Sequence, residues 1–114
     1  MDVVIIDFDG EIEDFPILIQ SVDGLIASGT RNLIIDLKPL GFINSAALGY
    51  LVSTQKTLER DGGKLALCRV TPGVMNILRL TALDEMFPVF DDEKDAVAHL
   101  SGDAEEVVSR HDWR

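Results

Sequence analysis

Residues 36–51 read D-L-K-P-L-G-F-I-N-S-A-A-L-G-Y-L, and this stretch decides the fold. It continues the apolar run Leu33–Leu37, which is typical of a strand covered on both faces. A loop with proline and glycine follows, and the polar pair Asn44-Ser45 then opens a helix. The buried face of that helix is predicted by apolar residues at helical spacing, namely Leu48, Leu51, Val52 and Leu58.

The same alternation of strand and helix extends along the chain in both directions. Further strands are predicted at Val3–Phe8, Lys64–Cys68 and Pro88–Phe90, and further helices before Ser28-Gly29, after Thr71-Pro72 and from Asp91-Asp92-Glu93. This order predicts an α/β fold with a small, mostly parallel sheet flanked by about four helices. We expect residues 1–101 to form one domain, and residues 102–114 to be a polar C-terminal tail or a short extra helix.

Composition excludes several classes of function. The formal net charge of −10 argues against nucleic acid and anionic membranes as ligands and favours a protein partner with a basic docking surface. No apolar stretch is long enough to enter a membrane as a span, and the N-terminus does not resemble a signal peptide, so a cytoplasmic location is expected. The single cysteine, Cys68, lies in an apolar run and is predicted to be a buried, inert thiol.

The sequence carries no recognisable catalytic or cofactor motif. It has no phosphate-binding glycine loop and no nucleophile elbow, so we expect neither enzymatic activity nor a cofactor. His99 and His111 have no cysteine or second histidine at metal-ligand spacing, which predicts no metal centre. Two groups of acidic residues remain. The first is interpreted as a solvated surface or a cation site and comprises Asp7, Asp9, Glu11, Glu13 and Asp14. The second is interpreted as acids at the start of a helix and comprises Asp91, Asp92, Glu93 and Asp95.

The pair Asn44-Ser45 has two interpretations. Either side chain could cap the helix by accepting a hydrogen bond from a free backbone amide, and capping alone would explain the pair. A hydroxyl at a helix N-terminus is also a suitable place for a phosphate, because the helix dipole tolerates the added charge within the domain while a docked partner is repelled.

The segment 36–51 resembles the signature of the STAS domain, the fold of bacterial anti-sigma factor antagonists. Its neighbours agree with the resemblance, which spans roughly residues 3–100. The agreeing segments are Gly10-Glu11-Ile12, Asp61-Gly62-Gly63-Lys64-Leu65, and Val74 and Leu78 followed by Thr81-Ala82-Leu83-Asp84 and Phe87.

This resemblance implies a partner-switching protein. The partner would be an anti-sigma factor with serine kinase activity, which phosphorylates Ser45 and is then released; Asn44 takes the position of the family's aspartate. Residues implied in partner binding are Phe42, Ile43, Asn44, Ser45, Ala46, Ala47, Leu48 and Gly49. Two other functions stay open, a constitutive STAS subunit of another complex, such as a lipid-transport ABC system, and a small-molecule-sensing module.

The chain departs from the family pattern in three places. Asn44 replaces the usual aspartate and removes a charge beside Ser45, and Ala46-Ala47 replaces a common Ser-Gly pair. Met1 also comes too early for the strand that usually precedes the one at Val3–Phe8. An uncovered sheet edge is prone to pair with other chains. We therefore expect that edge to be covered by a second copy in a homodimer, by a partner, or by the C-terminal tail.

Overall fold

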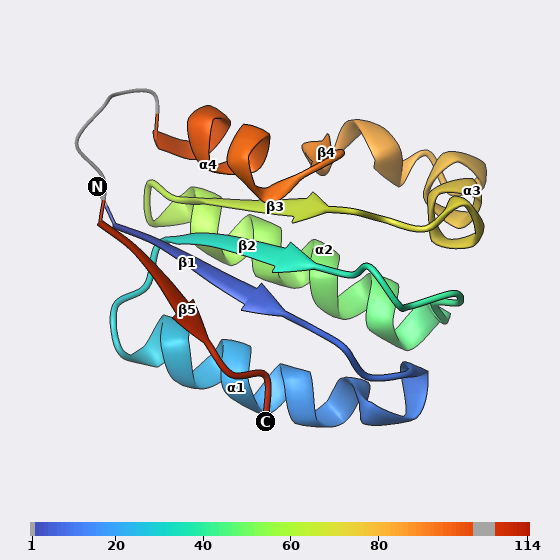
Figure 1. Ribbon diagram of the computed structural model, residues 1–114, viewed down its shortest axis with the longest axis horizontal. Helices are drawn as coiled ribbons and strands as arrows, with labels where there is room; N and C mark the ends of the chain where they lie inside the picture. The colour runs from blue at the N-terminus through green and yellow to red at the C-terminus, as the bar shows by residue number, and fades with distance from the viewer. Residues whose placement is uncertain (1, 102–106) are drawn as a thin grey trace.

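The computed structural model describes residues 2–101 and 107–114, which form an α/β fold built on one parallel sheet (Figure 1). In the described residues the sheet has the order β4-β3-β2-β1-β5. The elements are β1 (Asp2–Asp7), η1 (Ile12–Asp14), α1 (Phe15–Ala27), β2 (Asn32–Asp36), α2 (Ser45–Arg60), β3 (Lys64–Cys68), α3 (Pro72–Leu80), η2 (Leu83–Glu85), β4 (Val89–Phe90), α4 (Glu93–Ser101) and β5 (Val107–His111). The predicted α/β class, with a parallel sheet and four helices, is confirmed.

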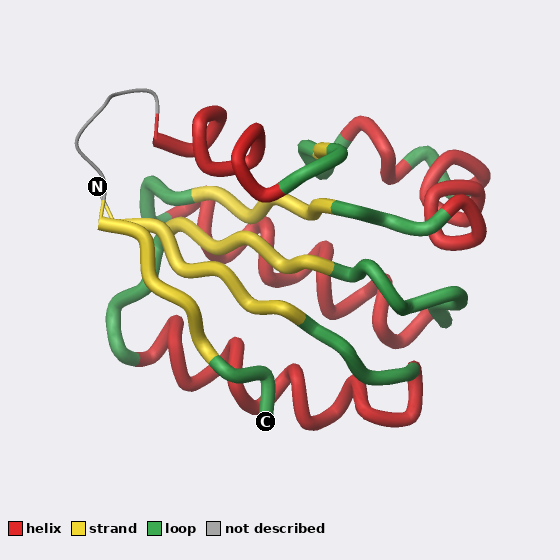
Figure 2. The backbone as a smooth tube through the Cα atoms, viewed as in Figure 1, coloured by secondary structure: helices red, strands yellow, loops and turns green. Residues whose placement is uncertain are grey.

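Strand β2 lies at the centre of the sheet. It pairs with β1 from Val3↔Asn32 to Asp7↔Asp36, and with β3 on its other side. All five of its residues are buried, as the apolar run that begins at Leu33 predicts for a strand covered on both faces. Because all paired strands run the same way, their carboxyl ends lie together at one end of the sheet, where the loops shown in green in Figure 2 begin.

Two cores of different size cover the faces of the sheet. On one face, alternate strand residues such as Ile6, Ile35 and Leu67 pack with buried side chains of α1, α2 and α3. On the other face, the intervening residues pack against the single helix α4 through Ala96 and Leu100. The larger core holds α2, so the segment 36–51 is anchored in the best-buried part of the molecule.

Capping residues begin the helices where the sequence predicts. The Asn44 side chain accepts a hydrogen bond from the Ala47 amide at the start of α2, and Thr71 does the same for the Val74 amide at the start of α3. At the other end of α2, Gly62 adopts φ +85°, a left-handed conformation that favours glycine.

The C-terminal tail corrects one expectation. Residues 107–111 form strand β5, which is neither a polar tail nor a short helix, while residues 102–106 lie outside the described part of the chain. Strand β5 pairs in parallel with β1 from Asp2↔Val107 to Ile6↔His111, so the edge of β1 is covered by the tail itself. Figure 1 shows β5, in red, alongside β1. Pairing satisfies backbone groups that an open edge would expose, which explains why a polar segment extends here.

Gly63 gives a direct test of this packing. A Cβ atom at residue 63 would lie 1.8 Å from the Arg31 carbonyl oxygen, and that oxygen already accepts a hydrogen bond from the Lys64 amide. We expect Gly63→Ala to lower the free energy of unfolding by about 2–3 kcal/mol, because backbone atoms must move apart. The matched control is Gly24→Ala in α1, where a Cβ meets nothing within 4 Å; it should stabilise by about 0.5–1 kcal/mol. Equal effects of the two variants in urea unfolding would contradict this packing.

Candidate partner-binding site

The loop between β2 and α2 is held in place by its neighbours at the carboxyl end of the sheet. The Lys38 amide donates to Asp36 Oδ1 at 3.0 Å, and Thr71 Oγ1 donates to the Leu40 carbonyl at 2.7 Å. Gly73, in the first turn of α3, lies so close to the Gly41 carbonyl that a Cβ there would be 2.6 Å from its oxygen. Helix α3 therefore fixes the loop that leads to Ser45.

The eight residues implied in partner binding divide into an inner and an outer set. Ile43, Ala47 and Leu48 are buried in the larger core, so they hold the segment rather than present it. The others are exposed, namely Phe42, Asn44, Ser45, Ala46 and Gly49. Because both sets belong to one short segment, packing of the buried residues holds the exposed residues in a fixed position.

Ser45 is the first residue of α2, and its side chain is exposed. Asn44 already caps the helix, since its Oδ1 accepts from the Ala47 amide at 2.8 Å. Within the described residues, the Ser45 hydroxyl forms no hydrogen bond. Capping therefore explains Asn44 and leaves the Ser45 hydroxyl available for chemistry.

Phe42 stands beside this serine as an exposed aromatic side chain. It is 56% exposed, so its ring is available for contact with another molecule. A hollow of about 240 Å³ lies next to it, between the loop 39–42 and the turn after β1. Glu11 and Glu13 line that turn side of the hollow, so the apolar side chain has an acidic rim.

A network of charged residues lies at the same end of the sheet, on the face covered by α4. Its centre is the Asp36 carboxylate at the end of β2, which is only 2% exposed. Arg69, directly after β3, donates to Asp36 through Nε at 2.6 Å and through its terminal nitrogen. Arg69 has φ +51°, a costly conformation for a residue other than glycine. Arg69 adopts this conformation while its guanidinium pairs with the buried Asp36 carboxylate.

The network continues to the C-terminal strand. Arg110 of β5 donates to Asp7 Oδ2 at 2.6 Å and to both oxygens of Glu93, at 2.5 and 3.3 Å. Arg69 Nη2 also lies 3.5 Å from Glu93. The five charged side chains therefore join the ends of β1, β2, β3 and β5 to the start of α4, and they line a hollow of about 600 Å³.

These contacts move the pKa values of the two outer carboxyl groups in opposite directions. A hydrogen bond to the Glu93 carboxyl group, together with burial, raises the pKa of Asp7 to about 6. The hydrogen bonds from Arg110 lower the pKa of Glu93 to about 2. Below pH 6, Asp7 thus holds a proton beside an ionised Glu93.

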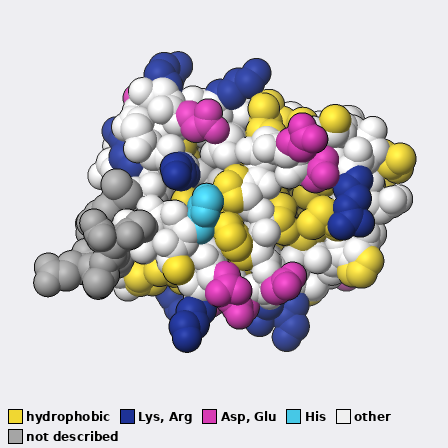
Figure 3. Space-filling view, turned by 90° about the horizontal axis from the view of Figure 1, so that it is seen from above, with side chains coloured by type: hydrophobic (Ala, Val, Ile, Leu, Met, Phe, Trp, Pro, Cys, Tyr) yellow, Lys and Arg dark blue, Asp and Glu magenta, His cyan; other side chains and the backbone are white. Residues whose placement is uncertain are grey.

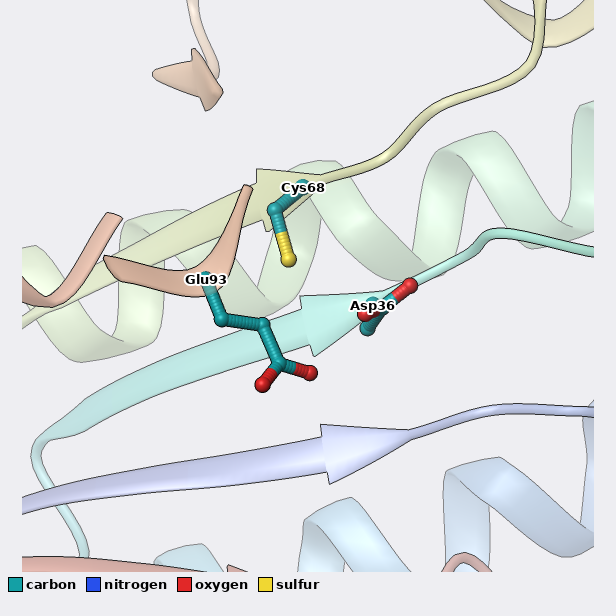
Figure 4. Close-up of side chains that lie close together, drawn as sticks. All are labelled: Asp36, Cys68 and Glu93. Carbon is teal, nitrogen blue, oxygen red and sulfur yellow. The ribbon is translucent and has the colours of Figure 1, made fainter. Parts of the chain in front are cut away.

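Asp36, Cys68 and Glu93 come close enough together to resemble a metal site (Figure 4). Their chemistry argues against that use. Asp36 is already paired with Arg69, and burial, followed by the Asp36 charge, raises the pKa of the Cys68 thiol to about 12. The Arg69 guanidinium would also repel a cation held beside Asp36. The prediction that Cys68 is a buried thiol is confirmed.

Sequence reasoning missed most of this network. Glu93 lies in the first turn of α4, as predicted, but its ion pair with Arg110 was not foreseen. Asp7 was interpreted as part of a solvated surface or a cation site, whereas the structure pairs it with Arg110. The five acidic residues near the N-terminus do not converge. Asp9 accepts from Trp113 Nε1, and Asp14 accepts from the Glu11 amide. No sequence pattern signals contacts between residues so far apart along the chain.

Another hollow lies along β4, which is the edge strand farthest from β5. None of the residues that line it belongs to the segment 42–49. Its volume is about 710 Å³, and Met75, Met86 and Val89 contribute apolar surface. Figure 3 looks onto this edge and shows hydrophobic side chains gathered between charged ones. His99 lines the hollow and is exposed, as predicted for a helix-surface residue, with its ring 5.1 Å from that of Phe90.

Comparison with known proteins identifies the family. The sequence profile described as the STAS domain matches residues 2–96. The chain belongs to the STAS domain family. This STAS domain is 28% identical over 110 residues to an anti-sigma F factor antagonist of Paenibacillus polymyxa, covering 94% of this chain and 90% of that one. It is also 30% identical over 73 residues to a putative anti-sigma factor antagonist of Bordetella bronchiseptica, covering 64% and 63% of the two chains.

Solved structures agree with the STAS assignment. An anti-sigma factor antagonist from Mycobacterium paratuberculosis is 26% identical, with a TM-score of 0.74 over 85% of this chain and 86% of that one. The antagonist SpoIIAA in its unphosphorylated form has a TM-score of 0.74 at 18% identity, covering 91% and 92%, which supports the fold alone. Among the residues that the structure describes, no helix of this STAS domain combines the length and the hydrophobicity needed to cross a membrane.

The paired carboxyl groups give a pH-dependent test. We expect the Asp7 side chain to titrate near pH 6 in a carboxyl-carbon NMR experiment, and Glu93→Gln to move that midpoint down toward about 4, because the shared proton and the Glu93 charge are lost. Glu59→Gln, on the exposed surface of α2, should leave Asp7 unchanged. A wild-type midpoint near 4 would contradict the contact.

The sign of the linked stability follows from the same shifts. Asp7 binds its proton more tightly in the folded chain, so its contribution to stability falls as the pH rises from about 4 through 6. Glu93 binds its proton less tightly in the folded chain, so its contribution is lost as the pH falls from about 4.5 toward 2.

Proposed function

We propose that this protein is an anti-sigma factor antagonist whose binding to an anti-sigma factor with serine kinase activity is controlled by phosphorylation of Ser45. The observation that carries the proposal is an exposed serine hydroxyl, without a hydrogen bond in the described chain, at the first position of α2 and three residues from the exposed Phe42. Sequence likeness to two anti-sigma factor antagonists supports the same function.

The unphosphorylated surface suits a protein partner. Phe42 offers an apolar anchor, and the small residues Ala46 and Gly49 on the exposed side of α2 allow a partner's backbone to approach closely. The acidic rim at Glu11 and Glu13 favours basic groups around the pocket that receives Phe42. We therefore propose that the partner receives Phe42 in a pocket bordered by basic groups, which face Glu11 and Glu13.

Phosphorylation would change this surface without unfolding it. A phosphate on Ser45 adds about −1.5 to −2 charge at neutral pH. The free amides and the dipole at the start of α2 stabilise that charge within the domain, because Asn44 occupies only one of those amides. A partner packed on Phe42 would lose contact with the surface, since a hydrated dianion replaces a small hydroxyl.

The proposed role is one of binding and not of catalysis. The buried Asp36 and the half-buried Glu93 are both paired with Arg69, and the nearby Cys68 thiol keeps its proton because burial raises its pKa. We propose the bacterial cytoplasm as the location, where an anti-sigma factor would meet this chain, and we propose neither a cofactor nor a metal.

Two variants of Ser45 separate the switch from a constitutive interaction. From a lysate of the source cells, we expect tagged wild-type chain and Ser45→Ala to capture an anti-sigma factor with a kinase domain. Ser45→Asp should bind it about tenfold more weakly or worse, because its charge lies in the interface. Ser53→Asp, exposed further along the same helix, controls for added charge on α2 and should bind like wild type.

Two other outcomes would each contradict the proposed function. Equal capture by wild type and Ser45→Asp of an anti-sigma factor would reject the phosphorylation switch. Equal capture of a transporter ATPase would make the chain a constitutive subunit of that complex, and Ser45 would then have no regulatory role.

A further inference from the structure

Trp113, the penultimate residue, is buried although it ends an otherwise exposed tail. It is 5% exposed and belongs to the larger core. Its Nε1 donates to Asp9 Oδ1 at 2.5 Å, its carbonyl accepts from Ser21 Oγ at 2.7 Å, and the Arg114 guanidinium lies over its ring at 4.7 Å. These contacts tie the C-terminus to the turn after β1 and to α1.

Strand β5 delivers Trp113 to this position. Its pairing with β1 ends at Ile6↔His111, two residues before Trp113, and Arg110 secures it to Asp7 and Glu93. In Figure 1 the C-terminus lies against the side of α1 just beyond the end of β5. The indole therefore reaches the end of β1, where the turn carrying Asp9 begins.

A series of edge-to-face aromatic contacts leads from Trp113 to the helix that begins with Ser45. The Trp113 ring meets Phe8 at 4.9 Å, Phe8 meets Phe15 at 6.0 Å, and Phe15 meets Tyr50 of α2 at 6.3 Å, with interplanar angles of 85°, 80° and 83°. The Tyr50 hydroxyl donates to Asp23 Oδ1 at 2.6 Å, which fixes the far end of the series on α1.

The turn after β1 receives a second constraint from Trp113. Gly10 packs so tightly that a Cβ there would lie 2.8 Å from Asp14 and 2.9 Å from the ring of Phe8, the ring that Trp113 contacts. The same turn continues into Glu11, Ile12 and Glu13, which face the loop of Phe42 across the small hollow. Trp113 thus supports both walls of the proposed partner surface, the turn through Asp9 and α2 through the aromatic series.

We propose that Trp113 is a positioning residue for the partner-binding surface, holding the turn 9–13 and the first turns of α2 in the geometry that the partner recognises. The expected effect on partner affinity rests on the proposed function. The expected effect on the structure of the free chain does not. Strand β5 then supports the partner-binding surface, because its pairing with β1 places Trp113 in contact with Asp9 and Phe8.

The free protein gives the first measurement, by backbone hydrogen exchange at a temperature where every variant is folded. Trp113→Ala should accelerate exchange at residues 10–13 and 45–50 and leave β3 unchanged. Trp113→Phe keeps a ring against Phe8 but loses the donor to Asp9, so it should affect residues 10–13 more than residues 45–50. The matched control is Val108→Ala, on the same strand but 43% exposed and outside the aromatic series.

The partner captured by wild-type chain gives the second measurement. Trp113→Ala should weaken its binding by about 2- to 30-fold, the range for mutations that act along a coupled network, while Val108→Ala should not. Unchanged exchange at residues 10–13, a uniform increase that includes β3, or unchanged affinity in the folded variants would each overturn the proposal. If Trp113→Ala does not fold, Trp113→Phe tests the contact with Asp9, through faster exchange at residues 10–13 and weaker binding of the partner.

Failure of the proposed function looks different. Equal binding of wild type and Ser45→Asp removes the switch at Ser45 whatever Trp113 does, whereas local acceleration of exchange in the free chain reports on Trp113 whatever the partner is.

Discussion

The buried carboxylate of Asp36 is the constraint on which the arrangement of the site depends. A charge with 2% exposure at the end of the central strand is costly unless it is paired and hydrogen-bonded. Arg69 supplies the charge, at the cost of a left-handed backbone, and the Lys38 amide supplies a further hydrogen bond. Together these contacts fix the direction in which the chain leaves β2, and so the path of the loop that ends at Asn44 and Ser45.

The network around Asp36 also explains how the tail is incorporated. Arg110 of β5 reaches Asp7 and Glu93, so one cluster joins the ends of four strands to the start of α4. The edge of β1 is thereby covered within the chain, and no second copy is needed to cover it. The same tail places Trp113 behind the turn that faces Phe42, and the partner surface gains a brace from the far end of the sequence.

Local patterns predicted most of the fold, and contacts distant in sequence account for what they missed. Apolar runs and helical spacing located β1 to β4 and the four helices. Thr71 and the pair Asn44-Ser45 were recognised as capping positions because capping depends on neighbours in sequence, and the structure selects Asn44 from that pair. Strand β5 was missed because only its first two residues, Val107 and Val108, are apolar, and it is stabilised by pairing with a strand at the other end of the chain. The Asp36–Arg69 pair escaped for the same reason, although Trp113 in a polar tail was a signal that the tail docks.

The central claim is that the partner binds where the segment 42–49 and the turn 11–13 meet at the carboxyl end of the sheet. The most direct test is hydrogen exchange of the whole chain, measured alone and in complex with the partner that it captures. The account predicts that the complex protects residues 11–13 and 42–49 and leaves the hollow along β4 as it is in the free chain. Protection confined to residues 75–89, which line the hollow at the opposite edge, would contradict it.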